Sequence, residues 1–202
     1  MNVAVLLTGV SYGARSRDWR TTSASVYDKV IDCWGEHNVS VYLTTYNHPS
    51  IEELLGFYNP KKHLILDYDG SDQRITYAKS LELLEGEDIH LVVATRFDID
   101  FHDKLSEYPI DYDKFNFLFR EGNGWWESDR FTNDNLFIFP NKYRGAMVDV
   151  VYSLHSNPHR GQSDLHPLYS RLAPIINESN TNFLSEEHEL SHSNTQYKLI
   201  RS

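Results

Sequence analysis

The chain has little of several features that would define its class at once. It contains a single cysteine among 202 residues, so no internal disulfide can form, and a reducing compartment such as the cytoplasm is expected. No apolar run approaches the roughly 18 residues that a membrane-spanning helix needs. No basic segment precedes the apolar residues 3–7, which argues against a signal peptide. We therefore expect neither a membrane span nor a disulfide-based fold.

Basic residues are also scarce. The sequence has 19 Lys and Arg against 29 Asp and Glu, a net charge of −10, which argues against nucleic acid as a partner. An anionic small substrate stays compatible with this charge if cations gather locally. The 40% of hydrophobic residues can fill one core, so we expect a single domain over residues 1–202. An expected strand ends close to Ser202, so this domain could be the N-terminal part of a longer polypeptide.

Apolar runs alternate with segments of helical periodicity in the first hundred residues. This alternation predicts an α/β fold with a mixed, mostly parallel central sheet and helices on both faces. The expected strands are residues 2–8, 39–45, 62–67 and 89–97, with helices around 22–34, 50–58 and 77–84. Later segments predict a more exposed or antiparallel strand at 115–119, a strand at 136–139, helices at 143–154 and 164–176, and a last strand at 197–200. A capping box is expected at Ser50-Ile-Glu-Glu53.

Two acidic pairs follow expected strands. The first is Asp67 and Asp69 in LILDYDG, which resembles the nucleophile motif of haloacid-dehalogenase-type phosphatases. In those enzymes the first aspartate attacks phosphorus and the second handles the leaving-group proton. Ser71 stands where that family usually has threonine, and the motif follows two strand–helix units rather than opening the chain. The alternative interpretation is a solvated turn that closes a strand.

The second pair is Asp98 and Asp100 in LVVATRFDID. In an extended segment residues i and i+2 share a face, so both carboxylates could point at one ion. Hard oxygen ligands suit Mg²⁺ or Mn²⁺, which take further ligands from phosphates and water. Arg96 could contact a phosphate or hold a carboxylate. The alternative is that the two acids are ordinary strand-end residues and that Arg96 is their surface partner.

Four segments carry a resemblance that favours the second pair. They are VAVLLTGVSYGARSR, VYLTTYN, VVATRFDIDF and SDRFTNDNLFIFP, in this order along the chain. Together they resemble nucleotide-sugar glycosyltransferases of the Rossmann-like GT-A fold, and more narrowly glycosyltransferase domains encoded by chlorella viruses. The resemblance covers most of the chain up to about residue 140. For a viral protein the expected compartment is the host cytoplasm.

The resemblance implies a donor, a metal and an acceptor. The donor would be a UDP-sugar, the acceptor a glycan or glycoprotein hydroxyl, and the metal Mn²⁺ or Mg²⁺ bound at a DxD motif. Asp100 would ligate the metal directly, and Asp98 would bind it through water or hold the donor. A third ligand would come from the C-terminal part, where His166 is the first candidate and His188 and His192 are others.

Residues at the ends of the first two strands are expected to hold the nucleotide, because ligands of such sheets bind beyond the carboxyl ends of the strands. Backbone amides near Thr8 and Gly9 could approach the base or a phosphate. Tyr12 could stack on the base, and Arg15 and Arg17 could meet the diphosphate. The short polar side chains that end the second strand are further candidates: Thr44, Thr45 and Asn47.

The segment GNGWWESDRFTNDN is the expected acceptor region. Trp125 or Trp126 could stack on a sugar ring, and Glu127, Asp129 or Asp134 could hold its hydroxyls. Asp134 is our first candidate for a general base in an inverting reaction; in a retaining reaction it would steady the donor sugar. The alternative without catalysis is a carbohydrate-binding domain that uses the tryptophan segment alone.

Overall fold

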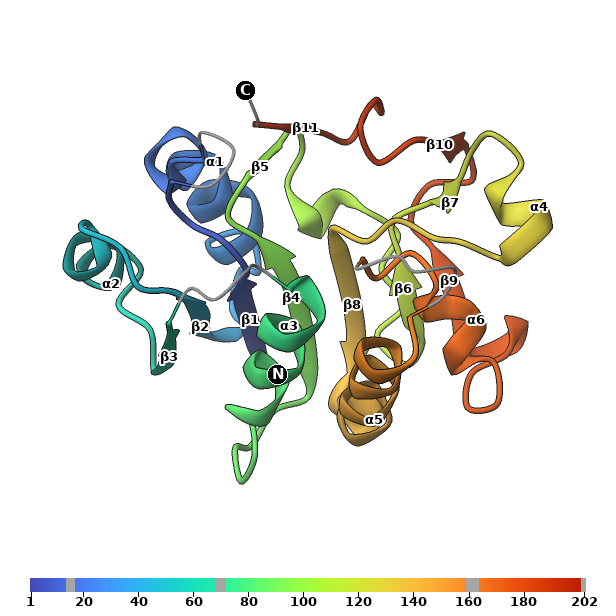
Figure 1. The fold of residues 1–202 in the computed structure, drawn as a ribbon, viewed down its shortest axis with the longest axis horizontal. Helices are drawn as coiled ribbons and strands as arrows, with labels where there is room; N and C mark the ends of the chain where they lie inside the picture. Colours follow the sequence, from blue (N-terminus) through green and yellow to red (C-terminus); the bar gives the residue numbers. More distant parts are fainter. Residues whose placement is uncertain (14–16, 68–71, 159–163, 201–202) are drawn as a thin grey trace.

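Strands from both halves of the chain join in one central sheet. The computed structural model describes residues 1–13, 17–67, 72–158 and 164–200. The strand order across the sheet is β3-β2-β1-β4-β8-β6-β9 (Figure 1). Every neighbouring pair is parallel except the two that involve β8, which runs against both β4 and β6. The predicted mixed, mostly parallel sheet is confirmed.

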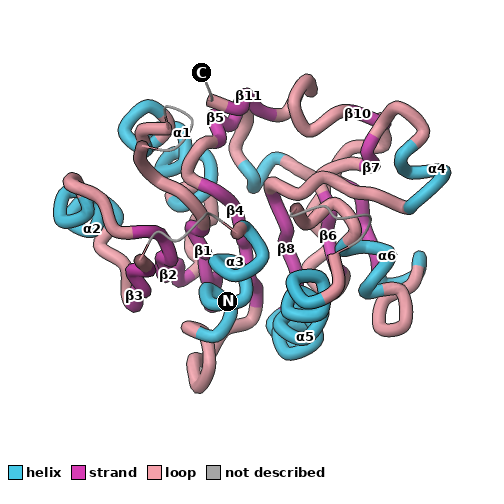
Figure 2. Tube along the Cα trace, in the orientation of Figure 1, coloured by secondary structure: helices cyan, strands magenta, loops and turns pink. Residues whose placement is uncertain are grey.

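The strands of the central sheet begin and end close to the expected bounds. They are β1 (Asn2–Thr8), β2 (Asn38–Tyr46), β3 (Lys62–Leu66), β4 (Leu91–Arg96), β6 (Phe115–Phe117), β8 (Leu136–Pro140) and β9 (Thr181–Phe183). Two small sheets lie beyond its edge, where loops dominate (Figure 2). They pair β5 (Ile99–Phe101) with β11 (Tyr197–Leu199), and β7 (Arg120–Glu121) with β10 (His188–Glu189).

The core has two halves, one on each face of the sheet. In β1 the side chains of Val3, Val5 and Leu7 enter one half, while Ala4 and Leu6 enter the other. This alternation follows from the two-residue period of a strand. Both sets are fully buried, as the near-continuous apolar run predicts for a strand covered on both faces.

Helices cover both faces of the sheet. The half of the core that contains Ala4 is closed by α3 (Gln73–Glu82), α5 (Arg144–Ser156) and α6 (Leu168–Leu172). The opposite half is closed by α1 (Ser23–Val26), its π-helical continuation Tyr27–Ile31, and α2 (Ile51–Tyr58). Figure 1 shows α3 and α5 in front of the sheet, with α1 and α2 at the left of the view. Single turns of 3₁₀ helix lie at Trp19–Thr21, Leu105–Glu107, Asn141–Tyr143 and Glu178–Asn180.

Two local predictions need correction, the capping box at Ser50 and the helix at 164–176. Ser50 precedes α2, but its side chain makes no capping bond, because its hydroxyl contacts His48 and Glu53 pairs with Arg20 instead. The strand at Phe115 is antiparallel to β8, which is one of the two expected alternatives, and it is fully buried. Only Leu168–Leu172 of the expected helix at 164–176 is helical, since Pro167 has no N–H to donate and opens the helix at its first turn.

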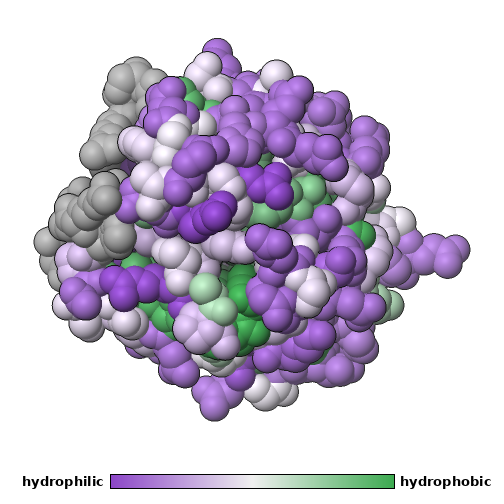
Figure 3. Space-filling model, turned by 90° about the vertical axis from the view of Figure 1, so that its right-hand side faces the viewer, coloured by the Kyte–Doolittle hydropathy of each residue, from purple (hydrophilic) through white to green (hydrophobic). Residues whose placement is uncertain are grey.

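Within the described residues, no helix combines the length and the apolar character needed to cross a bilayer. The side of the molecule that carries α4 (Trp125–Asp129) and α6 is mainly hydrophilic, with apolar side chains confined to small areas (Figure 3).

Phe137 tests the packing of the sheet against α3. Its ring is 1% exposed and lies 5.5 Å from the ring of Tyr77 and 5.9 Å from that of Phe117. We expect Phe137→Ala to lower the free energy of unfolding by about 3–5 kcal/mol, because it removes buried apolar surface and leaves a cavity. Urea unfolding measures this. The exposed Tyr112 is the control, whose Ala variant should change stability by no more than about 0.5 kcal/mol.

Candidate active site

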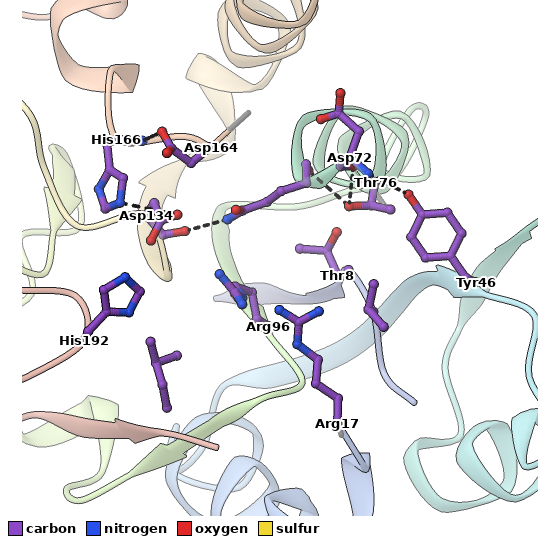
Figure 4. A pocket seen from close by; sticks show the side chains of 14 residues that line it. Thr8, Arg17, Tyr46, Asp72, Thr76, Arg96, Asp134, Asp164, His166 and His192 are labelled. Carbon is purple, nitrogen blue, oxygen red and sulfur yellow. Dashed lines mark hydrogen bonds and ion pairs between the residues drawn. The ribbon is translucent and has the colours of Figure 1, made fainter. Parts of the chain in front are cut away.

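A cavity of about 350 Å³ lies where the central strands end. The parallel strands β1, β2 and β4 all point their carboxyl ends at this edge. Because β8 is antiparallel to β4, its beginning lies at the same edge, with Leu136 opposite Thr95. The cavity therefore collects side chains from distant segments. They are Thr8, Gly9, Val10, Arg17, Tyr46, Asp72, Gln73, Thr76, Arg96, Asp134, Asp164, His166, His192 and Leu199 (Figure 4).

Two arginines form the basic side of the cavity. Arg96 at the end of β4 donates from Nε to Oδ1 of Asp98 at 2.9 Å and from Nη2 to Oδ2 at 2.7 Å. Arg17 donates from Nε to the same Oδ2 at 2.8 Å. A third nitrogen of Arg96 reaches Oδ1 of Asn135 at 3.0 Å. Burial lowers the pKa of Arg96, but the charges of Asp98 and Asp134 outweigh this and raise it overall.

The hydrogen bonds from Arg17 and Arg96 fix the position of the Asp98 side chain. Its carboxylate is 4% exposed, and both oxygens accept hydrogen bonds from guanidinium groups. The predicted strand through Phe97 is wrong, because β4 ends at Arg96 and Phe97 and Asp98 form a turn before β5. Asp98 and Asp100 therefore do not share the face of one extended strand. Asp100 lies in β5, opposite Lys198 of β11, and is not among the residues that line the cavity.

The residues predicted to hold Mn²⁺ or Mg²⁺ do not fit a metal ion in this arrangement. Such ions need carboxylate oxygens whose lone pairs are available, and two cations already occupy those of Asp98. Among the residues that the structure describes, no three His, Cys, Asp or Glu side chains are grouped as a metal site. The trio Asp98, Asp100 and His166 thus stays a prediction from the resemblance.

The opposite side of the cavity is acidic. His166 donates from Nδ1 to the carbonyl of Thr132 at 2.9 Å, and its Nε2 lies 3.8 Å from Oδ2 of Asp134. Asp164 also lies next to this imidazole (Figure 4), and Oε1 of the buried Glu121 is 3.5 Å from Nδ1. Burial lowers the pKa of His166, but these three carboxyl groups more than offset it, so the pKa is raised. Burial raises the pKa of Glu121 and Asp164.

The first turn of α3 forms the third side. Asp72 caps the helix by accepting a hydrogen bond from the backbone N–H of Arg74 at 2.9 Å. Burial raises the pKa of Asp72, but hydrogen bonds from Arg74 and His155 outweigh it and lower the pKa. Gln73 donates from Nε2 to the carbonyl of Asp134 at 3.0 Å, which ties α3 to the acidic side. The hydroxyl of Tyr46 accepts from the N–H of Asp72 at 3.2 Å.

Thr8 and Gly9 lie between these sides, as predicted from the end of β1. The hydroxyl of Thr8 is buried, and no hydrogen-bond partner for it occurs in the part of the chain that the structure describes. Gly9 has φ of +101°, a conformation that favours glycine, and an added Cβ would meet no atom within 4 Å. The backbone here is thus accessible to a ligand. Arg15, another predicted contact, lies outside the described residues.

The other nucleotide candidates lie beside the cavity rather than in its wall. The ring of Tyr12 stacks on His48 with centroids 5.3 Å apart. The hydroxyl of Thr45 lies 2.7 Å from that of Ser11, which in turn lies 2.9 Å from Nε2 of His48. Thr44 is buried, and Asn47 is exposed. None of these four predicted residues lines the cavity, although Tyr46 between them does.

The predicted acceptor residues form helix α4 instead of a loop. Trp125 is 41% exposed, and its ring lies 6.0 Å from that of His166, so it stands near the acidic side. Trp126 packs against Tyr169 and Phe183 with centroids 5.0 and 5.3 Å apart, which gives it a structural role.

The two acids of the same helix are held by local contacts. Glu127 lies 3.3 Å from Nδ1 of His188, and Asp129 accepts a hydrogen bond from Ser128 at 2.7 Å. Neither acid lines the cavity, and neither does either tryptophan.

Sequence reasoning missed four polar residues of the cavity, which are Asp72, Gln73, Thr76 and Asp164. Asp72 and Gln73 open α3, and the signal that could have found them is their place after the third strand, where ligands of such sheets bind. Asp164 had no local signal in the sequence, because only tertiary packing brings it to the cavity. Arg17, Arg96, Asp134 and His166 were predicted, and all four line the cavity.

Comparisons with known proteins identify the fold. No protein-family model and no curated protein matches the chain. Two structures of the glycosyltransferase GlyE of Streptococcus pneumoniae TIGR4 match with TM-scores of 0.53 and 0.50 and identities of 12% and 13%. They cover 91% and 95% of this chain, which spans only 44% and 45% of theirs.

A third match is the galactosyltransferase LgtC in complex with donor and acceptor sugar analogues. Its TM-score is 0.55 at 11% identity, over 91% of this chain and 73% of that one. At these identities the likeness shows a glycosyltransferase-type fold, as predicted, and no finer property. The narrower resemblance to viral domains stays a prediction.

The raised pKa of His166 predicts that stability falls as pH rises. The folded pKa lies above the ordinary 6.5, so the contribution of the imidazolium is complete below about 6.5 and is lost as pH passes the folded pKa. We expect wild type to lose more stability than His166→Gln between about pH 6 and about pH 9. Each kcal/mol of this difference in unfolding free energy corresponds to a difference of about 2–4 °C in Tm. Thermal unfolding across this range measures the difference.

The exposed His63 provides the control, because its Gln variant should follow the wild-type pH profile. If the Tm of wild type and of His166→Gln changed with pH in parallel, the raised pKa of His166 would be contradicted.

Proposed function

We propose that the chain is a glycosyltransferase that moves a sugar from a nucleotide-sugar, most simply a UDP-sugar, to a hydroxyl of a glycan or glycoprotein. One observation carries this proposal: the cavity of a glycosyltransferase-type fold has arginines on one side and Asp134 with His166 on the other. An activated sugar has the complementary form, with an anionic diphosphate at one end and hydroxyl groups at the other.

The nucleotide would lie along the ends of β1 and β2. The buried hydroxyl of Thr8 can donate a hydrogen bond to a base or phosphate, and the open space at Gly9 leaves room for one. Tyr12 and His48 already stack on each other, so their rings could extend the stack to a base. The sugar would then point toward Asp134 and Gln73, where a carboxylate and an amide can accept and donate bonds to hydroxyls.

The reaction breaks the bond between the anomeric carbon and a diphosphate oxygen and forms a bond from that carbon to the acceptor oxygen. In an inverting reaction, the acceptor proton would pass to Asp134, whose carboxylate His166 orients and stabilises across 3.8 Å. In a retaining reaction, the same carboxylate would contact the donor sugar, and the proton would leave with the diphosphate. Positive groups on the other side would stabilise the charge that develops on the diphosphate.

Mn²⁺ or Mg²⁺ remains a prediction for this reaction. A divalent ion would supply Lewis-acid stabilisation of the leaving diphosphate. The carboxylate of Asp98 is held by two guanidinium groups, so no step of the proposed reaction is assigned to the metal. The donor assay therefore includes an arm without metal.

The acceptor would approach over α4. Trp125 is the exposed aromatic surface nearest to the acidic side, and its ring can stack on the C–H face of a sugar. Glu127 and Asp129 lie on the same helix and could hold acceptor hydroxyls at its rim.

Asp134 carries the first test. Asp134→Asn should lower sugar transfer by about 10²–10⁴-fold, because the amide neither takes a proton nor stabilises positive charge. The measurement is consumption of a panel of UDP- and GDP-sugars, each with Mn²⁺ and with EDTA. Asp67→Asn is the matched control, since Asp67 is exposed at the end of β3 and does not line the cavity.

The rival functions give different results in the same assay. A phosphatase would release phosphate from a simple phosphoester, and Asp67→Asn would abolish this. A carbohydrate-binding domain would consume no donor under any condition. Either result would exclude the proposed transferase.

Trp125 carries a test of acceptor binding. We expect Trp125→Ala to raise the KM for the acceptor about tenfold, from the loss of one stacking contact, with donor hydrolysis unchanged. Trp126→Ala is the informative contrast, because this ring packs between Tyr169, Phe183 and the guanidinium of Arg130. It should lower the melting temperature instead. Equal effects of the two variants on KM would argue against an acceptor platform at Trp125.

A further inference from the structure

We propose that Arg17 and Arg96, held together by Asp98, form a diphosphate-binding site that works without a divalent metal ion. The inference rests on the proposed function, because the diphosphate is that of a nucleotide-sugar donor. It assigns to guanidinium groups the task that the sequence alone assigned to a metal at the DxD motif.

The first step is the charge of the cluster. Two permanently charged guanidinium groups share the single carboxylate of Asp98 at 2.7 and 2.8 Å. Among the described residues, two guanidinium groups thus face one carboxylate in a chain whose net charge is −10. Both arginines line the cavity, and Figure 4 shows their guanidinium groups next to each other below Thr8. A diphosphate is the natural partner of paired planar guanidinium groups, because each can offer parallel N–H donors to its oxygens.

The second step is the surroundings of the cluster. Thr8 and Arg96 are register partners on the adjacent strands β1 and β4, so the buried hydroxyl of Thr8 lies beside the arginines. This hydroxyl is a further donor for anionic oxygens. The carboxyl groups of Asp134 and Asp164 disfavour phosphate on their side of the cavity. We therefore expect the phosphates to bind beside the arginines.

The third step concerns Asp98 itself. In this arrangement it is a positioning residue, because it accepts three N–H bonds that fix the directions of both guanidinium groups. A divalent ion at the same carboxylate would replace these bonds and would stand directly beside two cations. Repulsion of that kind is strong in a buried place, where water screens it poorly.

The experiment measures binding of UDP and of GDP by calorimetry, in EDTA and in Mn²⁺. We expect at least one of them to bind in EDTA with an affinity within about threefold of that in Mn²⁺. Inorganic pyrophosphate should compete, and uridine alone should not. Arg17→Gln should weaken binding in EDTA about ten- to hundredfold, the usual effect of losing a charge-assisted hydrogen bond, and Arg17→Lys should restore part of it.

Arg20→Gln is the matched control, because Arg20 lies in the same segment but pairs with Glu53 and Asp18 and does not line the cavity. It should change the affinity less than twofold. Melting temperatures establish that each variant is folded, and the comparison of EDTA with Mn²⁺ needs no variant at all.

The two proposals fail in different ways. If nucleotide binds and donor is consumed only with Mn²⁺, the metal-free site is wrong and the glycosyltransferase stands. If nucleotide binds in EDTA but Arg17→Gln binds as wild type does, the arginine site is likewise wrong. If neither nucleotide binds under either condition and no donor is consumed, both proposals are wrong.

Discussion

The buried charge of Asp98 is the constraint on which the cavity depends. A carboxylate that is 4% exposed cannot stay ionised without close partners, and Arg17 and Arg96 supply them. Because Arg17 precedes α1 and Arg96 ends β4, this one charge fastens the segment after β1 to the end of β4. The hydroxyl of Thr22 adds a bond to the carbonyl of Phe97 and fastens the same turn from the other side. Loss of Asp98 would leave two guanidinium groups buried side by side.

Much of the sheet could be predicted from local patterns. The runs at Asn2–Thr8 and Leu91–Arg96 are apolar on both faces, and only a central strand buries such a segment completely. The alternating order of strands and helices predicts a parallel sheet, and such a sheet predicts a ligand site at the carboxyl ends of its strands. That logic found Thr8, Arg96 and Asp134 before any coordinates, since each adjoins the end or the beginning of a strand at one edge.

Local sequence patterns did not predict the contacts between side chains that are distant in the sequence. The turn at Phe97 and Asp98 contains neither glycine nor proline, so the strand seemed to continue through it. Arg17 and Arg96 lie 81 and 2 residues from Asp98 along the chain, and the spacing of an aspartate pair does not distinguish a metal site from an arginine site. Asp72 and Asp164 join the cavity through the packing of α3 and of the segment after α5, which only tertiary structure specifies.

The basic side and the acidic side of the cavity together determine how a ligand with two chemically different ends is oriented. His166 stands among Glu121, Asp134 and Asp164, so one imidazole faces three carboxyl groups on this side of the cavity. The arginine side keeps its positive charge at every physiological pH, because guanidinium groups do not titrate there. A molecule with an anionic end and a polyhydroxyl end therefore has one favourable orientation in the cavity. Its reversed orientation would place phosphate against carboxylates, so electrostatics alone favours the orientation in which the polyhydroxyl end faces Asp134.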